Sequence, residues 1–155
     1  MLSRILPRLV ASSLLAFGSL TSCVSVDHLA PTYQGPVATI DQKVIVDSEK
    51  RNCGFVLAVD DKRYAFSDVS KLKDVFNVEP GRHRLLLRGH VVYLMELRNF
   101  SPSPHSQGWV DVTLQPAHRY RVQTRTDAAG TSVWLVDETS GHPASPVIAP
   151  GTHEP

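Results

Sequence analysis

The chain has 155 residues, with 16 lysines and arginines against 15 aspartates and glutamates, and a formal net charge of +1 at pH 7. This near-neutrality argues against a dedicated nucleic-acid binder, because that class depends on clustered basic residues that displace counterions. A hydrophobic content of 42% with 20% charged residues is typical of a folded chain and not of a disordered one. We therefore expect a single folded domain and no nucleic-acid partner.

Residues 1–22 have the pattern of an export signal. Arg4 and Arg8 supply a short positive region, and the stretch from Leu9 to Leu20 is apolar apart from small residues. This stretch is too short to span a bilayer comfortably as a permanent helix. We therefore expect residues 1–22 to be a cleaved signal peptide.

The sequence Leu20-Thr21-Ser22-Cys23 follows this apolar stretch. Small side chains at Thr21 and Ser22 suit a processing peptidase, and Cys23 offers an accessible thiol at the bilayer surface. The stretch resembles the lipobox of bacterial lipoprotein signal peptides, which are cleaved directly before the cysteine. The resemblance implies that Cys23 becomes the mature N-terminus and carries a diacylglyceryl group and an N-acyl chain, with no other cofactor. An ordinary signal peptide with a coincidental cysteine and an uncleaved N-terminal anchor are the alternatives.

The residue after the lipidated cysteine bears on where such a protein is sorted. In Gram-negative lipoproteins an aspartate at this position tends to retain the protein in the inner membrane, whereas this chain has Val24. For a Gram-negative source, the resemblance therefore implies an outer-membrane lipoprotein that faces the periplasm. One acyl chain binds a membrane only marginally and two or more anchor it stably, so the membrane is the expected lasting partner.

Cys23 and Cys53 are the two cysteines of the chain. If Cys23 is lipidated, Cys53 has no partner for an intramolecular disulfide. We interpret Cys53 as a small buried residue beside Gly54 at the start of a strand; an intermolecular or redox role is the alternative. A Cys23–Cys53 disulfide is compatible only with failure of the lipobox interpretation.

Strand patterns fill residues 37–140, after a tether at residues 23–36 and before a Pro- and Gly-rich tail at 141–155 that we expect to be disordered, with a short edge strand at Val147 and Ile148 as an option. The clearest alternation runs from His83 to Leu97, where odd positions include Leu85 and Leu87, with Gly89 as a bend. By similar criteria we expect strands at 39–46, 54–59, 110–114, 120–125 and 131–136, turns at 47–52, 60–62 and 127–130, a helical option at 67–78 and a loop at 99–108.

Six to seven short strands with little helix predict an all-β fold, an antiparallel β-sandwich. The mature region also loosely resembles envelope β-sandwich modules of the PEGA and transthyretin-like kinds, which are commonly non-catalytic surface or periplasmic modules. The stretches that carry this resemblance are Pro80-Gly81-Arg82-His83 leading into Leu85-Leu86-Leu87, residues 117–122, and residues 134–141.

Neither metal binding nor catalysis is indicated by the residue spacing. No pair of the seven histidines has a tight zinc-ligand spacing, and His105, His142 and His153 fall in segments that we expect to be flexible. Asp60 and Asp61 are adjacent, but turn formation is their expected role. Motifs of serine hydrolases, zinc peptidases and phosphate-binding loops are absent from the sequence. We expect no metal site and no enzymatic activity.

Arginines on two predicted strands give the strongest sign of binding. If these strands were neighbours, their outward arginines would form a ladder that grips phosphate or carboxylate groups of lipopolysaccharide or peptidoglycan. A solvated sheet face that discourages edge pairing is the alternative interpretation. We therefore expect a non-catalytic structural or interaction module with an envelope protein or glycan partner, and as an alternative a module that binds anionic glycans. The arginines are Arg84, Arg88, Arg119, Arg121 and Arg125.

Overall fold

The computed structural model describes residues 27–42, 45–46, 50–63, 74–93 and 105–154, and these residues form an all-β fold. Among them there is no helix, and so none that could cross a membrane. The strands are β1 (Ala38–Asp41), β2 (Ile45–Val46), β3 (Lys50–Val59), β4 (Lys62–Arg63), β5 (Val75–Val78), β6 (Gly81–Tyr93), β7 (His105–Leu114), β8 (Arg119–Asp127), β9 (Gly130–Asp137) and β10 (His142–Pro143).

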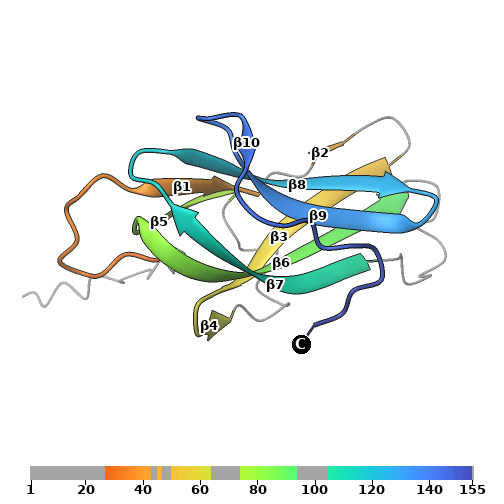
Figure 1. Ribbon diagram of the computed structural model, residues 1–155, viewed down its shortest axis with the longest axis horizontal. Helices are drawn as coiled ribbons and strands as arrows, with labels where there is room; N and C mark the ends of the chain where they lie inside the picture. Colours follow the sequence, from red (N-terminus) through yellow and green to blue (C-terminus); the bar gives the residue numbers. More distant parts are fainter. Residues whose placement is uncertain (1–26, 43–44, 47–49, 64–73, 94–104, 155) are drawn as a thin grey trace, which may run out of the picture.

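Two sheets pack face to face, which confirms the predicted sandwich (Figure 1). Sheet A has the order β10-β9-β8-β1-β5, and sheet B has the order β2-β3-β6-β7 with β4 paired to β3. All strand pairs are antiparallel except β1 with β8. The described residues form more strands than the six to seven predicted, because two-residue strands such as β2, β4 and β10 are too short to show a hydrophobic period.

The core lies between the sheets and is built by alternation. In β7 the even positions Val110, Val112 and Leu114 are buried, and in β8 the even positions Tyr120 and Val122 are buried. Side chains on a strand point alternately to its two faces, so one face of each strand supplies the core. The other core residues are Ala38, Ile40, Val56, Val59, Phe76, Val78, Leu85, Leu87, Val133, Leu135 and Ile148.

A pair of glycines sets how closely the sheets approach. Gly54 in β3 lies opposite Gly89 in β6, and β6 continues through Gly89 as one strand. A Cβ atom on Gly54 would lie 2.8 Å from Val122 Cγ1, and one on Gly89 would lie 2.8 Å from Val133 Cβ. Since both valines belong to sheet A, the glycine pair is required for this close packing.

The predicted first strand at 39–46 divides between the two sheets. β1 pairs in sheet A and β2 in sheet B. Two buried polar residues lie at the end of β1: Asp41 is its last residue and Gln42 follows it. The side-chain Oε1 of Gln42 accepts a hydrogen bond of 3.0 Å from the buried N–H of Val56. Of the expected turn at 47–52, residues 50–52 belong to β3, which begins at Lys50, and residues 47–49 lie outside the described residues.

Parts of two segments form strands where a helix and a loop were expected. In the helical option at 67–78, Val75–Val78 forms β5, and residues 67–73 lie outside the described residues. In the expected loop at 99–108, β7 begins at His105, and residues 99–104 lie outside the described residues. Pairing with β1 and β6 supplies the backbone partners that a local pattern does not reveal.

Both chain ends pack against sheet edges in the described part, which differs from the expected tether and disordered tail. His28 donates its backbone N–H to Asn77 O at 2.8 Å at the edge of β5. Ile148 exchanges two backbone hydrogen bonds with Val133 in β9 and is 8% exposed, and the chain then reaches Gln107 in β7. The C-terminal segment is ordered because Ile148 fills the side of the sandwich between β9 and β7.

Candidate functional site

The five predicted arginines do not form one ladder. Arg84 and Arg88 lie on β6 in sheet B, whereas Arg119, Arg121 and Arg125 lie on β8 in sheet A. The two strands are therefore not neighbours in a sheet, and their side chains belong to different layers of the sandwich. The structure separates the five arginines into two groups that need separate treatment.

Carboxylates neutralise the arginines of sheet A. Arg119 Nη2 lies 2.8 Å from Asp41 Oδ2, and Arg119 Nε lies 3.2 Å from Glu138 Oε2. Arg121 Nη2 lies 2.6 Å from Glu138 Oε1. The hydrogen bond to Asp41 raises the pKa of the Arg119 guanidinium above its ordinary value. Because each guanidinium already holds a carboxylate, an incoming anion would have to displace it.

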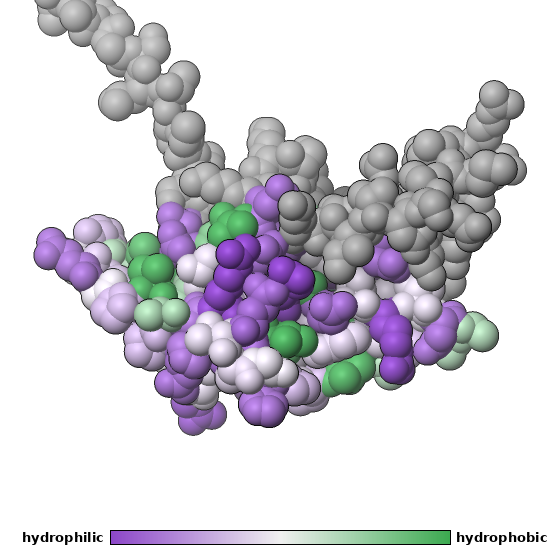
Figure 2. All heavy atoms as spheres, turned by 90° about the horizontal axis from the view of Figure 1, so that it is seen from above, coloured by the Kyte–Doolittle hydropathy of each residue, from purple (hydrophilic) through white to green (hydrophobic). Residues whose placement is uncertain are grey.

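Arg125 and Arg88 are also poorly placed to bind an anion. Arg125 is exposed, and its Nε lies 3.8 Å from Asp127 Oδ2, a solvent-screened pair. Arg88 is partly buried, and burial lowers the pKa of its guanidinium. From above, on the side of Figure 1 that carries β1, β8 and β10, hydrophilic residues dominate the described surface and hydrophobic ones stand singly or in small groups (Figure 2). This view shows no broad apolar patch among the coloured residues.

Arg84 is the member of the predicted set that faces an unusual neighbour, the indole of Trp109. The Arg84 Cζ atom lies 4.7 Å from the centroid of the Trp109 ring, and Arg63 Cζ lies 5.5 Å from it. Both distances are within the range of cation–π attraction. Among the described residues, neither Arg63 nor Arg84 forms an ion pair with a carboxylate. Two guanidinium groups are thus held at one aromatic ring without a bound carboxylate.

A hollow of about 320 Å³ lies at this group, lined by Asp60, Asp61, Arg63, Arg84 and Trp109. These residues come from the β3–β4 turn, β4, β6 and β7. In the β6–β7 register, Arg84 lies opposite Asp111 and Leu86 lies opposite Trp109. Arg84 and Trp109 are therefore diagonal neighbours on the two strands, which brings the guanidinium to the indole. The hollow is therefore a product of sheet register, and we call it the Trp109 hollow.

Asp60 fixes the rim of the Trp109 hollow. Its φ of 52° makes the tight turn after β3, its backbone N–H donates to Arg84 O at 2.7 Å, and its Oδ1 accepts from Arg84 N–H at 2.9 Å. Its Oδ2 lies 2.9 Å from His83 Nδ1. Burial alone raises the pKa of Asp60, but the hydrogen bonds from Arg84 and His83 outweigh it and leave that pKa below its usual value. The carboxylate is thus committed to the backbone and to His83.

The floor beside the hollow is apolar. A register shift in β3 between Val56 and Ala58 adds Leu57 to the strand. Leu57, Ala58 and Leu86 form a second buried cluster on the outer face of sheet B, and Phe55 and Trp109 pack against it. The arginines therefore lie beside a buried apolar cluster, and the Trp109 indole is the apolar group that lines the hollow with them.

Sequence reasoning alone does not single out Trp109 or Arg63. The alternation of Trp109 with the core residues Val110 and Val112 places the indole on the outer face, and a large outward aromatic side chain is the available signal. Arg63 gives no signal of its own, because its approach to the ring depends on the β3–β4 turn and on the register of three strand pairs.

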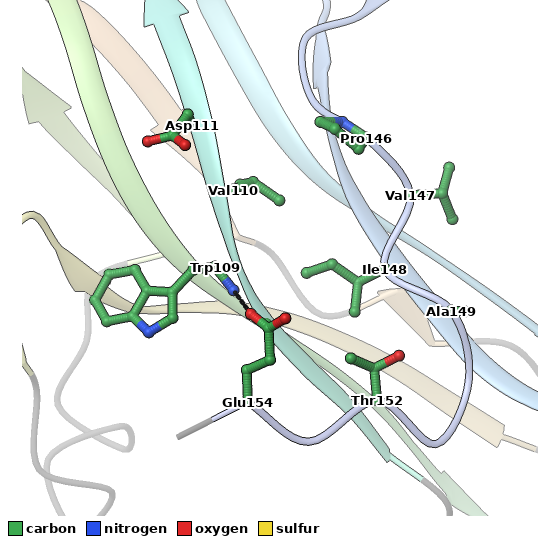
Figure 3. A pocket seen from close by; sticks show the side chains of 10 residues that line it. Trp109, Val110, Asp111, Pro146, Val147, Ile148, Ala149, Thr152 and Glu154 are labelled. Atoms are coloured by element: carbon green, nitrogen blue, oxygen red, sulfur yellow. Dashed lines mark hydrogen bonds between the residues drawn. The ribbon is translucent and has the colours of Figure 1, made fainter.

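A second hollow, of about 490 Å³, lies between β7 and the C-terminal segment (Figure 3). Gly108 to Asp111 line one side, and Pro146 to Ala149 line the other together with Thr152 and Glu154. The Trp109 indole points away from this hollow, while its backbone N–H donates to Glu154 Oε2 at 3.1 Å (Figure 3). Trp109 thus separates two hollows, which lie on the outer face and at the edge of sheet B.

Two histidine contacts lie away from the Trp109 hollow, one between His118 and Asp137 and one between His105 and His153. His118 Nδ1 lies 2.8 Å from Asp137 Oδ2, and Asp137 Oδ1 accepts hydrogen bonds from the N–H groups of Thr139 and Ser140. This His–Asp pair binds the turn after β9, and the Ser140 side chain also hydrogen-bonds to Asp137.

His105 and His153, both expected in flexible segments, have ring centroids 4.4 Å apart at the start of β7. His105 is the first residue of that strand, and His153 bridges to Gln107. Among the described residues, no group of three His, Cys, Asp or Glu side chains is arranged to hold a metal ion. The two rings therefore mark the point where the C-terminal segment meets β7.

The predicted lipidation site, Cys23 with Leu20, Thr21 and Ser22, lies outside the described residues. Cys53 is buried, in agreement with its interpretation as a small interior residue. No family model, curated protein or solved structure matches the chain.

Proposed function

We propose that this protein is a lipid-anchored, non-catalytic interaction module of the bacterial cell envelope. The support for the anchor is the stretch Leu20-Thr21-Ser22-Cys23 behind an apolar export signal, with diacylglyceryl and N-acyl chains on Cys23. Val24 after the cysteine favours the outer membrane of a Gram-negative cell, with the folded domain in the periplasm. The module holds its ligand by surface contacts and performs no chemistry on it.

The ligand class that fits best is an anionic glycan, and the Trp109 hollow is the site. The observation that carries this proposal is that Arg63 and Arg84, without ion-paired carboxylates among the described residues, lie 5.5 Å and 4.7 Å from the Trp109 ring centroid. Guanidinium groups grip phosphates and carboxylates through paired N–H donors. An indole beside them offers an apolar face to a sugar ring. Phosphorylated or carboxylated sugars of lipopolysaccharide or peptidoglycan combine both features.

The site differs from the ladder expected from sequence. Arg119 and Arg121 are ion-paired with Asp41 and Glu138, so an anionic ligand would have to displace these carboxylates. Arg84 remains from the predicted set, and Arg63 takes the place of a neighbouring-strand arginine. Before binding, the cation–π contacts with Trp109 keep the guanidinium groups desolvated on one side and positioned for a ligand.

The experiment is sedimentation of the full-length protein, in detergent, with purified peptidoglycan and with lipopolysaccharide. We expect the wild type to sediment with at least one of them, and Arg63→Ala with Arg84→Ala to reduce the bound fraction several-fold. Arg125→Ala is the matched control, because it removes an exposed charge of sheet A whose nearest carboxylate is 3.8 Å away. Equal sedimentation of the wild type and the double variant with both materials excludes the anionic-glycan proposal.

A further inference from the structure

β7 is the edge strand of sheet B, and the C-terminal segment already pairs with its first half. Gln107 N–H donates to Thr152 O at 2.7 Å, and Glu154 N–H donates to Gln107 O at 3.0 Å. The bridge between Gln107 and His153 is parallel. The Gln107 side chain adds a bond of 2.9 Å to Glu154 O. This chain therefore shows that the β7 edge accepts an extended segment.

The second half of the same edge has open backbone groups. The N–H groups of Gln107 and Trp109 point to the outer edge of β7, where they meet the C-terminal segment. Successive backbone groups of a strand alternate in direction, so the N–H groups of Asp111 and Thr113 point to the same edge. In the part of the chain that the structure describes, neither N–H has a hydrogen-bond partner. Two ladder donors are thus available beyond Trp109.

The hollow of about 490 Å³ extends along β7 as far as Asp111, the first of these two donors (Figure 3). On its far side, Pro146, Val147 and Ile148 supply apolar surface, and Val147 is 57% exposed. An added strand sends alternate side chains to opposite faces, so a segment along β7 can place one apolar side chain here. The hollow therefore provides a side-chain site next to backbone donors.

The charge at this edge selects the partner. Asp111 and Glu154 are exposed and line the hollow on its β7 and C-terminal sides. Both carry negative charge at neutral pH, and no ion pair of Asp111 or Glu154 is found among the described residues. A basic side chain next to the apolar one complements them. A second copy of β7 would instead bring Asp111 toward another Asp111 and is disfavoured.

We propose that the Asp111–Thr113 edge of β7 docks an extended peptide segment of a partner protein, in which an apolar side chain alternates with basic ones. The segment adds as a strand to sheet B, accepts hydrogen bonds from the Asp111 and Thr113 N–H groups, and places its apolar side chain beside Val147. This site is separate from the Trp109 hollow, so either proposal can fail without the other.

The test uses the full-length protein in detergent micelles and two acetylated, amidated peptides, Lys-Val-Lys-Val-Lys and Glu-Val-Glu-Val-Glu. We expect the basic peptide to bind at least tenfold more tightly than the acidic one. We also expect it to slow hydrogen exchange of the Asp111 and Thr113 amides by at least fivefold while the Gly130 amide is unchanged. Asp111→Lys should weaken binding of the basic peptide at least tenfold.

Thr113→Pro is the second variant, because proline on the outward side of an edge strand removes one ladder donor and leaves the bonds to β6 in place. It should weaken binding of the basic peptide several-fold, whereas Arg125→Ala on sheet A should leave that binding unchanged. Equal binding of both peptides, or unchanged exchange at Asp111 and Thr113, overturns the proposal. Protection of these amides that rises with protein concentration and without peptide would assign the edge to a second copy and also overturn it.

Discussion

Arg119 and Asp41 join two strands that run in parallel in sheet A: Arg119 Nη2 of β8 lies 2.8 Å from Asp41 Oδ2 at the end of β1. The Asp41 side chain is 5% exposed and that of Arg119 is 55% exposed. The carboxylate therefore depends on the arginine for compensation of a buried charge, whereas the arginine does not depend on it for solvation. This asymmetry makes Arg119 a structural residue.

Replacement of Arg119 by methionine is expected to lower the melting temperature by several degrees, because Asp41 would keep a buried charge without its guanidinium partner. Arg121→Met is the matched control, since its partner Glu138 is more exposed at 26% and the pair contributes little. Thermal unfolding by circular dichroism at pH 7 measures both. Equal melting temperatures for the two variants would contradict the assigned role of Arg119.

Gly89→Ala is expected to destabilise the domain by about 1–3 kcal/mol, because the new Cβ would lie 2.8 Å from Val133 Cβ and would push the sheets apart. Gly108→Ala is the control on the neighbouring strand, where the nearest atoms, from Ile148 and Glu154, lie 3.4 Å from the added Cβ. Its expected effect is below about 1 kcal/mol. Urea unfolding measures both free energies, and a Gly89 variant as stable as the wild type would refute the close-packing account.

The stability of the domain should fall as the pH drops from about 7 toward 5. Burial, with smaller effects from Arg88 and His105, lowers the pKa of His90 below its ordinary value of 6.5, and burial also lowers that of His28. Below pH 6.5 the unfolded chain therefore binds protons that the folded chain does not, so the free energy of unfolding decreases.

The variant that tests this is His90→Phe, which keeps a ring to stack on Phe55, at a centroid distance of 5.6 Å in the wild type. We expect the free energy of unfolding of this variant to fall less between pH 7 and pH 5 than that of the wild type. The decrease that His28 causes should remain. Urea unfolding at several pH values measures the slope. An identical slope in the wild type and the variant would show that His90 does not contribute.

The mass of the mature protein extracted from membranes tests the anchor. We expect a chain that begins at Cys23 and carries the added mass of a diacylglyceryl group and an N-acyl chain. Cys23→Ser should abolish the lipid, because serine lacks the thiol to which the diacylglyceryl group is attached. A mass equal to an unmodified chain from any cleavage site, or unchanged added lipid mass on the Cys23 variant, rules the lipoprotein proposal out.

Local patterns predict the strands that contribute alternate residues to the core. β7 and β8 were predictable because Val110, Val112, Tyr120 and Val122 each fall two residues apart within a strand. The turn at 60–62 predicts the hairpin of β3 with β4, whereas β10 and the division between β1 and β2 were not predictable, because their pairing is set by distant partners. Ile148 pairs with Val133, in agreement with the edge-strand option at 147–148, but the order of the surrounding segment was not predictable, because Ile148 is a single anchor within a Pro- and Gly-rich sequence.

The candidate site was predictable in part for the same reason. Alternation places Arg84 and Arg119 on outward faces, but the sheet that each strand joins decides their neighbours. Arg119 is ion-paired with the Asp41 carboxylate, whereas Arg84 of β6 lies over the Trp109 ring of the neighbouring strand β7. Residue type and period therefore indicate which side chains are outward, and topology decides which of them can bind a ligand.

The most direct test of the anionic-glycan proposal follows the two indole N–H signals of ¹⁵N-labelled full-length protein in detergent micelles. The chain has two tryptophans, Trp109 in the proposed site and Trp134 in β9 of sheet A. Titration uses N-acetylmuramic acid and glucosamine 1-phosphate, with uncharged N-acetylglucosamine as the control sugar.

With at least one anionic sugar, the Trp109 signal is predicted to shift and saturate while Trp134 stays unchanged, and the shift is lost in Arg84→Ala. The uncharged sugar should shift Trp109 much less at the same concentration, because it lacks the group that the guanidinium groups hold. A Trp109 signal that stays in place with both anionic sugars, or that moves equally with the uncharged one, would contradict the proposed function.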